Sequence, residues 1–119
     1  MTKPFTLIIE DSPVFSQMFS RALKDEFEVE VIQDGRDALT RLSVVTPDLM
    51  VLDLHLPGVS GKDILDRVKS DERFVKTRII LTTSDERQAE ELRDLVDIVL
   101  LKPIYPGQLR ELASRIKGD

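Results

Sequence analysis

Five short apolar runs, separated from one another by segments with helical spacing, are the feature that most constrains how this chain can fold. The runs lie at residues 5–9, 27–32, 49–54, 79–83 and 98–101. When strands and helices alternate along a chain, the strands are usually parallel, joined by right-handed crossovers, and covered by helices on both faces of the sheet. The sequence therefore predicts an α/β domain built on a doubly wound sheet of five parallel strands.

The segments between the runs predict the helices. Ser12 and Pro13 are typical of an N-cap and a first helical position, and apolar residues recur at helical spacing at positions 14, 18, 19 and 22. Three further apolar stripes predict helices at 38–42, 64–68 and 109–116. The segment 88–95 has few apolar positions and many charges, so we expect a short helix there that packs less firmly.

The patterns of the runs indicate where each strand lies in the sheet. The runs LIIE, LMVLDL and DIVLL are nearly continuous, which is typical of central strands covered on both faces. The run FEVEVI alternates, with Glu28 and Glu30 on one side, so we expect it at an edge. We find no internal repeat or linker in the 119 residues, and residues 1–119 are predicted to form a single domain.

Composition excludes several classes of protein. The chain contains no cysteine, so it has no disulfide, thiolate nucleophile or cysteine zinc site. No apolar run approaches the roughly 20 residues that span a bilayer, and we expect a soluble, cytoplasmic protein without membrane contact. The 17 basic and 22 acidic residues give a net charge of -5, which argues against direct binding of nucleic acid.

Polar residues with chemical potential stand at the predicted carboxyl ends of the strands. In a doubly wound sheet these ends meet where the strand order reverses, and ligands bind there. Three carboxylates, hydroxyl groups and an ammonium group are therefore expected to converge, from Glu10, Asp11, Asp53, Thr82, Thr83 and Lys102.

Three carboxylates close together repel one another unless a positive charge joins them. Ligation by oxygen alone is the preference of a hard cation such as Mg²⁺. We expect Asp11 and Asp53 to be direct ligands, Glu10 to act through water, and the backbone carbonyl of His55 to fill another position. A carboxylate beside a metal and a lysine is suited to attack a phosphoryl group, so Asp53 is the predicted nucleophile.

Four motifs together resemble the receiver domain of two-component response regulators: LIIEDSP, VLDLHLPGVSG, IILTTS and LLKP, in this order and at these separations. The resemblance covers nearly the whole chain. It implies a flavodoxin-like (βα)5 fold with strand order 2-1-3-4-5. It also implies that a partner histidine kinase or histidine phosphotransfer protein phosphorylates Asp53, with Glu10 and Asp11 as the Mg²⁺ acids.

The resemblance assigns the remaining polar residues as well. Thr82 becomes the switch hydroxyl and Lys102 the lysine that contacts the phosphoryl group, while Thr83 is a second candidate for the hydroxyl. The bond before Pro103 is expected to be cis, as is typical of the family. The family's aromatic switch residue, three positions before the lysine, corresponds here to Val99, so the output surface is left open.

Two other functions compete with the phosphorylation switch. A pseudo-receiver would keep the fold as a phosphorylation-independent interaction module, and Val99 together with the short segment 82–102 favours it slightly. A hydrolase of the haloacid-dehalogenase type would place a second aspartate two residues after the nucleophile, where this chain has His55. The sequence leaves open the output partner, a phosphorylation-dependent homodimer, and whether the domain is part of a longer regulator or kinase.

Overall fold

The five apolar runs form the strands of one parallel sheet in the computed structural model, which describes residues 2–117. The strands are β1 (Phe5–Ile9), β2 (Glu28–Ile32), β3 (Leu49–Asp53), β4 (Arg78–Thr83) and β5 (Ile98–Leu101). Each strand begins and ends within one residue of its predicted bounds. Their order in the sheet is β2-β1-β3-β4-β5, which confirms the predicted flavodoxin-like topology.

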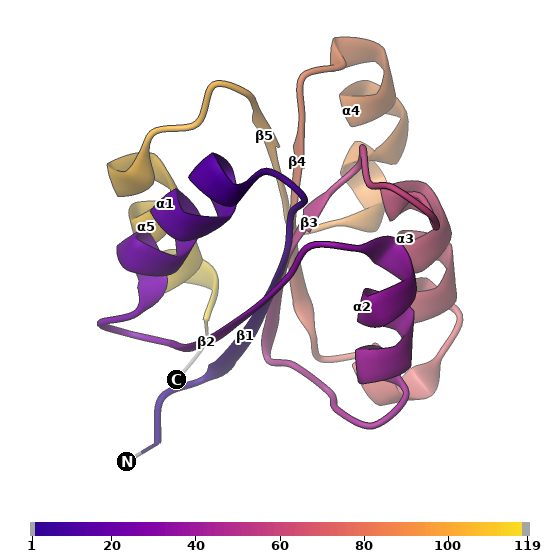
Figure 1. The fold of residues 1–119 in the computed structure, drawn as a ribbon, viewed down its shortest axis with the longest axis horizontal. Helices are drawn as coiled ribbons and strands as arrows, with labels where there is room; N and C mark the ends of the chain where they lie inside the picture. Colours follow the sequence, from indigo (N-terminus) through magenta and orange to yellow (C-terminus); the bar gives the residue numbers. More distant parts are fainter. Residues whose placement is uncertain (1, 118–119) are drawn as a thin grey trace.

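Five α-helices cover both faces of the sheet; four of them connect successive strands, and the fifth follows β5 (Figure 1). They are α1 (Pro13–Leu23), α2 (Gly35–Leu42), α3 (Gly61–Lys69), α4 (Glu86–Leu92) and α5 (Pro106–Ile116). Helices α1 and α5 pack on one face, and α2, α3 and α4 pack on the other. Short 3-10 turns follow α3 and α4, at Glu72–Phe74 and Arg93–Leu95.

Each central strand contributes to two apolar cores, because successive residues of a strand point to opposite faces of the sheet. Ile8 of β1 belongs to the core that contains Phe19 of α1 and Leu109 of α5. Its neighbour Leu7 belongs to the other core, with Leu65 of α3. This double cover explains why the sequence of β1 is a continuous apolar run instead of an alternating one.

Helix α1 begins as the sequence predicted, but its buried side agrees with the predicted stripe only in part. The Oγ of Ser12 accepts a hydrogen bond from the N–H of Phe15 at 3.3 Å, and Pro13 is the first helical residue. Val14 belongs to the predicted apolar stripe, yet 71% of it is exposed. Phe19 and Ala22 of that stripe are buried as predicted, and Ser16 and Leu23 are buried beside them.

The two edges of the sheet were predicted unequally well. Strand β2 is an edge strand, as its alternating pattern indicated, and Glu30 pairs with Arg41 of α2 at 2.8 Å. Strand β5 is the other edge, so the expectation from DIVLL of a central strand is wrong, although Val99 packs against one core and Leu100 belongs to the other. Leu101, the last residue of this edge strand, is 42% exposed.

The region around α4 agrees with the sequence in outline. The helix is short, and it buries Ala89 and Leu92. The carboxylate of Asp85 caps it by accepting hydrogen bonds from the next turn. The bond between Lys102 and Pro103 is cis, as expected. Within residues 2–117, every helix is too short or too polar to cross a membrane.

Candidate functional site

Three carboxylates come together at the carboxyl end of the sheet, between β1 and β3. These strands are neighbours, but β1 leads into α1 on one face of the sheet and β3 into α3 on the other (Figure 1). Carboxylate oxygens of Glu10, Asp11 and Asp53 lie within 4.8 Å of one another. The strand order reverses at this point, where doubly wound sheets bind their ligands.

Asp53 ends β3 and is only 2% exposed. Its Oδ1 accepts a hydrogen bond from the N–H of His55 at 3.2 Å and lies 3.5 Å from the Nζ of Lys102. The aspartate therefore ends a buried strand with its carboxylate held by one N–H donor and one ammonium. This is the placement that the sequence predicted for it.

Glu10 follows β1 and is still more buried, at 1% exposure. Its Oε2 accepts a hydrogen bond from the N–H of Ser12 at 3.1 Å, and its Oε1 accepts one from the Lys102 ammonium at 3.0 Å. Burial raises the pKa of the Glu10 carboxyl to about 7, although the bonds from Ser12 and Lys102 oppose this effect. The negative charge of Asp53 adds to the increase in pKa.

Lys102 follows β5 and brings the positive charge to the site. Its backbone N–H donates to the carbonyl of Thr83 at 2.8 Å, which fixes the residue beside β4. In the part of the chain that the structure describes, it is the basic residue that pairs with Glu10 and Asp53. The ammonium also lies 4.7 Å from the ring centroid of Phe15, a contact that no pattern in the sequence indicated.

The two threonines that end β4 have different surroundings. Thr82 is paired in register with Asp53, so both side chains point to the same face, and Thr82 is fully buried. Its Oγ1 has no hydrogen-bond partner among the described residues. Thr83 points to the opposite face, where its Oγ1 accepts a hydrogen bond from the N–H of Asp85 at 3.0 Å.

His55 lies on the exposed rim of the site. Its ring Nε2 is 3.5 Å from the Oγ1 of Thr83, and its N–H is directed at Asp53. The predicted role of its carbonyl as a metal ligand stays a prediction. The structure thus brings together Glu10, Asp11, Asp53 and Lys102, and it places Thr82, Thr83 and His55 beside them.

Gly61 was not singled out in the sequence, but the site depends on its small size. It is the first residue of α3, and its N–H donates to the carbonyl of Leu54 at 3.1 Å. A Cβ at this position would overlap the carbonyl oxygen of Asp53. The Ser-Gly pair before an apolar stripe signals a helix start, but no local pattern reveals that this glycine touches the backbone of Asp53.

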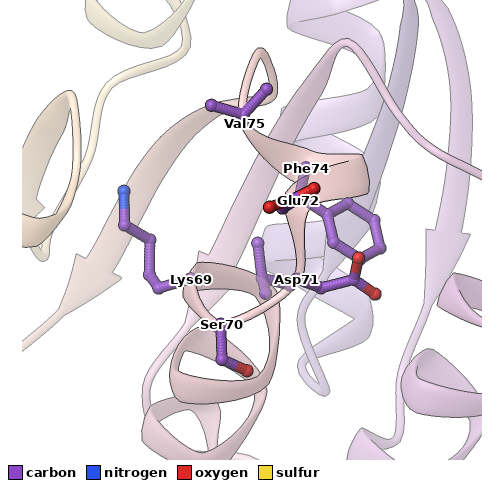
Figure 2. A pocket seen from close by; sticks show the side chains of 7 residues that line it. Lys69, Ser70, Asp71, Glu72, Phe74 and Val75 are labelled. Carbon is purple, nitrogen blue, oxygen red and sulfur yellow. The ribbon is translucent and has the colours of Figure 1, made fainter.

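A hollow at the end of α3 differs in character from this site (Figure 2). It is lined by Val68, Lys69, Ser70, Asp71, Glu72, Phe74 and Val75. The Lys69 side chain points to one side of it, whereas the Asp71 carboxylate and the Phe74 ring point to the other. Its charged groups do not converge, so the carboxyl end of the sheet is the better candidate for chemistry.

The family comparison gives a match along most of the chain. The model of the family described as "Response regulator receiver domain" matches residues 6–114. The transcriptional regulatory protein TrcR of Mycobacterium tuberculosis is 34% identical over 115 residues, which cover 94% of this chain and 43% of TrcR. Hybrid signal transduction histidine kinase D of Dictyostelium discoideum is 28% identical over 114 residues, 96% of this chain and 7% of the kinase. The chain spans less than half the length of these relatives.

A solved structure shows the same arrangement of elements. The chemotaxis response regulator CheY4 of Vibrio cholerae is similar with a TM-score of 0.87 and 27% sequence identity. The likeness covers 97% of this chain and 99% of that chain.

Proposed function

The chain belongs to the response regulator receiver family, and on this basis we propose that it is a signalling switch whose Asp53 accepts a phosphoryl group. The observation that carries the proposal is the position of Asp53. It is a buried carboxylate at the end of β3, 3.5 Å from the Lys102 ammonium and close to two further acids, Glu10 and Asp11. A carboxylate in this setting is suited to nucleophilic attack on phosphorus.

The proposed donor is a phosphohistidine on a histidine kinase or a histidine phosphotransfer protein. A carboxylate oxygen of Asp53 attacks the phosphorus, and the P–O bond forms as the P–N bond breaks. The imidazole nitrogen keeps the electron pair, so the products are an acyl phosphate on Asp53 and an unmodified histidine on the partner. The Lys102 ammonium offsets negative charge on the oxygens in transfer.

The donor set fits a divalent cation, because all three side chains offer carboxylate oxygens, which a hard ion such as Mg²⁺ prefers. We propose Asp11 and Asp53 as direct ligands and Glu10 as a ligand through water. The carbonyl of His55 is proposed as a further oxygen donor. Mg²⁺ bound there would offset the negative charge of the phosphoryl oxygens.

Thr82 is proposed to donate its hydroxyl to a phosphoryl oxygen. Two features support this role: the Thr82 hydroxyl has no other partner among the described residues, and the side chain points to the same face as Asp53. A shift of Thr82 toward the phosphoryl group would move the loop after β4 and change the surface offered to a partner. Thr83 stays a second candidate, because its hydroxyl lies beside His55.

The domain is proposed to act in the cytoplasm as a single unit of residues 1–119, without direct contact to nucleic acid or membrane. It would catalyse only its own phosphorylation and dephosphorylation. The family match does not support the alternative of a haloacid-dehalogenase-type hydrolase. The output partner would be an attached domain, a separate protein or a second copy of the chain.

Uptake of a phosphoryl group tests the proposal. The protein is incubated with Mg²⁺ and a small phosphodonor such as acetyl phosphate, and its intact mass is followed over time. We expect wild type and the control Asp66→Asn, an exposed residue of α3, to gain one phosphoryl group. Asp53→Asn should gain none. A wild type that stays unmodified would contradict the proposal.

A pseudo-receiver remains the second candidate, and Val99 favours it. This residue stands where the family usually has an aromatic switch residue, and it is half-buried against the core beneath α2, α3 and α4. A beryllofluoride adduct of Asp53 separates the two functions. The switch predicts changes in amide NMR shifts in the loop after β4 and in α4, whereas a pseudo-receiver predicts changes limited to residues next to Asp53.

A further inference from the structure

Phe15 in the first turn of α1 contacts the lysine of the site, which also pairs with two carboxylates. The Nζ of Lys102 lies 4.7 Å from the ring centroid, 3.0 Å from Oε1 of Glu10 and 3.5 Å from Oδ1 of Asp53. The Lys102 side chain is 18% exposed. The ammonium is therefore held between two carboxylates and an aromatic face.

The position of the Phe15 ring is fixed from two directions. Its backbone N–H donates to the Oγ of Ser12 at 3.3 Å, and its ring centroid lies 5.9 Å from that of the fully buried Phe19. Ser12 also donates its own N–H to Oε2 of Glu10. One N-cap residue thus anchors both the carboxylate and the ring that hold Lys102.

An aromatic ring holds an ammonium differently from a carboxylate. Lysine is a strongly hydrated charge on a flexible stem, so contacts to Glu10 and Asp53 alone leave its position dependent on their charge. Phosphorylation would change the charge at Asp53. The attraction of the ring face for the ammonium does not depend on that carboxylate, and it leaves N–H donors of Lys102 free for oxygens.

We propose that Phe15 is a positioning residue for Lys102, which it keeps directed at the Asp53 carboxylate before transfer and at the phosphoryl group after it. The inference rests on the proposed function, since it names how the lysine of that reaction is held. Phe15 does not touch the reacting atoms, so its effect must be measured through Lys102 as well as through the reaction.

The variants separate the effect of the aromatic face from the effect of the volume of the side chain. Phe15→Leu and Phe15→Met remove the aromatic face and keep an apolar side chain, and Phe15→Tyr keeps the face. Phe74→Leu is the matched control, because Phe74 also lies beneath a cation, the Arg73 guanidinium at 4.6 Å, and belongs to the other core. Two variants without the ring allow the test to proceed if one of them fails to fold.

The first readout needs no phosphodonor. Protons of the Lys102 side chain that lie over a ring are shifted upfield in the NMR spectrum. We expect this shift in wild type, Phe15→Tyr and Phe74→Leu, and its loss in Phe15→Leu and Phe15→Met. Unshifted Lys102 protons in wild type would overturn the proposal.

The second readout is the initial rate of phosphoryl uptake with Mg²⁺ and acetyl phosphate. Phe15→Leu and Phe15→Met should react roughly three- to tenfold more slowly than wild type, and Phe15→Tyr and Phe74→Leu near the wild-type rate. Wild-type rates in folded Phe15→Leu and Phe15→Met would overturn the positioning role and leave the proposed function standing. A wild type that takes up no phosphoryl group would instead overturn the proposed function.

Discussion

The Lys102 ammonium lies 3.0 Å from Oε1 of Glu10, although the segments that carry them follow β5 and β1, which two other strands separate. Burial still raises the pKa of Glu10 to about 7, so the ion pair does not fully offset the loss of water around the carboxylate. The Glu10 carboxyl therefore holds its proton to a higher pH than an exposed glutamate does.

This pKa predicts a pH dependence of stability. Because the pKa is about 7 in the folded state and near the ordinary value of 4.5 when unfolded, the folded state holds the proton more tightly. The Glu10 contribution to the free energy of unfolding is thus most favourable below pH 4.5, and it falls as the pH rises to about 7. Glu10→Gln removes the titrating group. The pH-dependent loss in the free energy of unfolding should therefore be smaller in the variant, by an amount on the order of 2 kcal/mol.

Urea denaturation of wild type and Glu10→Gln measures this pH dependence of the free energy of unfolding. The experiments are done at about pH 5 and about pH 8, without divalent cations. We expect the wild type to lose more stability than the variant between the two conditions. Equal losses would show that Glu10 does not titrate in this way.

The two threonines of β4 should respond differently to the loss of a hydroxyl. Thr82→Val removes a buried hydroxyl that has no partner among the described residues, so the free energy of unfolding should stay unchanged or rise by about 1 kcal/mol. Thr83→Val removes the acceptor of the Asp85 N–H and should cost about 1 kcal/mol. Chemical denaturation measures the free energy of unfolding of both variants. A larger loss of stability in Thr82→Val than in Thr83→Val would contradict the finding that, of these two hydroxyls, only that of Thr83 has a hydrogen-bond partner within residues 2–117.

The close approach of Gly61 to Asp53 predicts that even one methyl group is not tolerated there. Gly61→Ala should lower the free energy of unfolding by about 2–4 kcal/mol, because the new Cβ would overlap the Asp53 carbonyl oxygen. Gly107→Ala is the control, since a Cβ added there would meet no described atom within 4 Å and α5 should gain up to about 1 kcal/mol. Similar effects of the two substitutions would argue against the contact.

Mg²⁺ should stabilise the folded domain through Asp11. A ligand at about 100 times its dissociation constant adds about 2.7 kcal/mol to the stability of the state that binds it. Thermal melts with and without Mg²⁺ should show an upward shift in wild type and in Asp66→Asn, and a much smaller one in Asp11→Asn. Asp11 is exposed, so its replacement should leave the fold intact. An equal shift in all three proteins would place the cation elsewhere.

Local patterns were sufficient for the strands and for the start of α1. Continuous apolar runs mark strands that are buried on both faces, and Ser12 with Pro13 marks the start of α1, because these signals depend on near neighbours in the sequence. The position of β5 at an edge depends on the whole sheet. A four-residue apolar run cannot reveal it, and the prediction of a central strand was wrong.

The candidate site was predictable where it depends on strand ends alone. Glu10, Asp53 and Lys102 each follow or end a strand, and parallel strands bring such positions to one edge of the sheet. The contact of Phe15 with Lys102 joins residues far apart in the sequence, and it depends on how α1 is rotated against the sheet. The same rotation explains why Val14 is exposed despite its place in the predicted stripe.

The proposed switch depends above all on Asp53 being the phosphoacceptor, and locating the phosphoryl group within the chain is the sharpest test of that role. After reaction with Mg²⁺ and a small phosphodonor, the acyl phosphate is reduced with borohydride, which converts the modified aspartate to homoserine, and peptides are sequenced by mass spectrometry. We expect homoserine at position 53 and at no other aspartate. An unmodified Asp53, or homoserine at another position such as 11, would contradict the assignment.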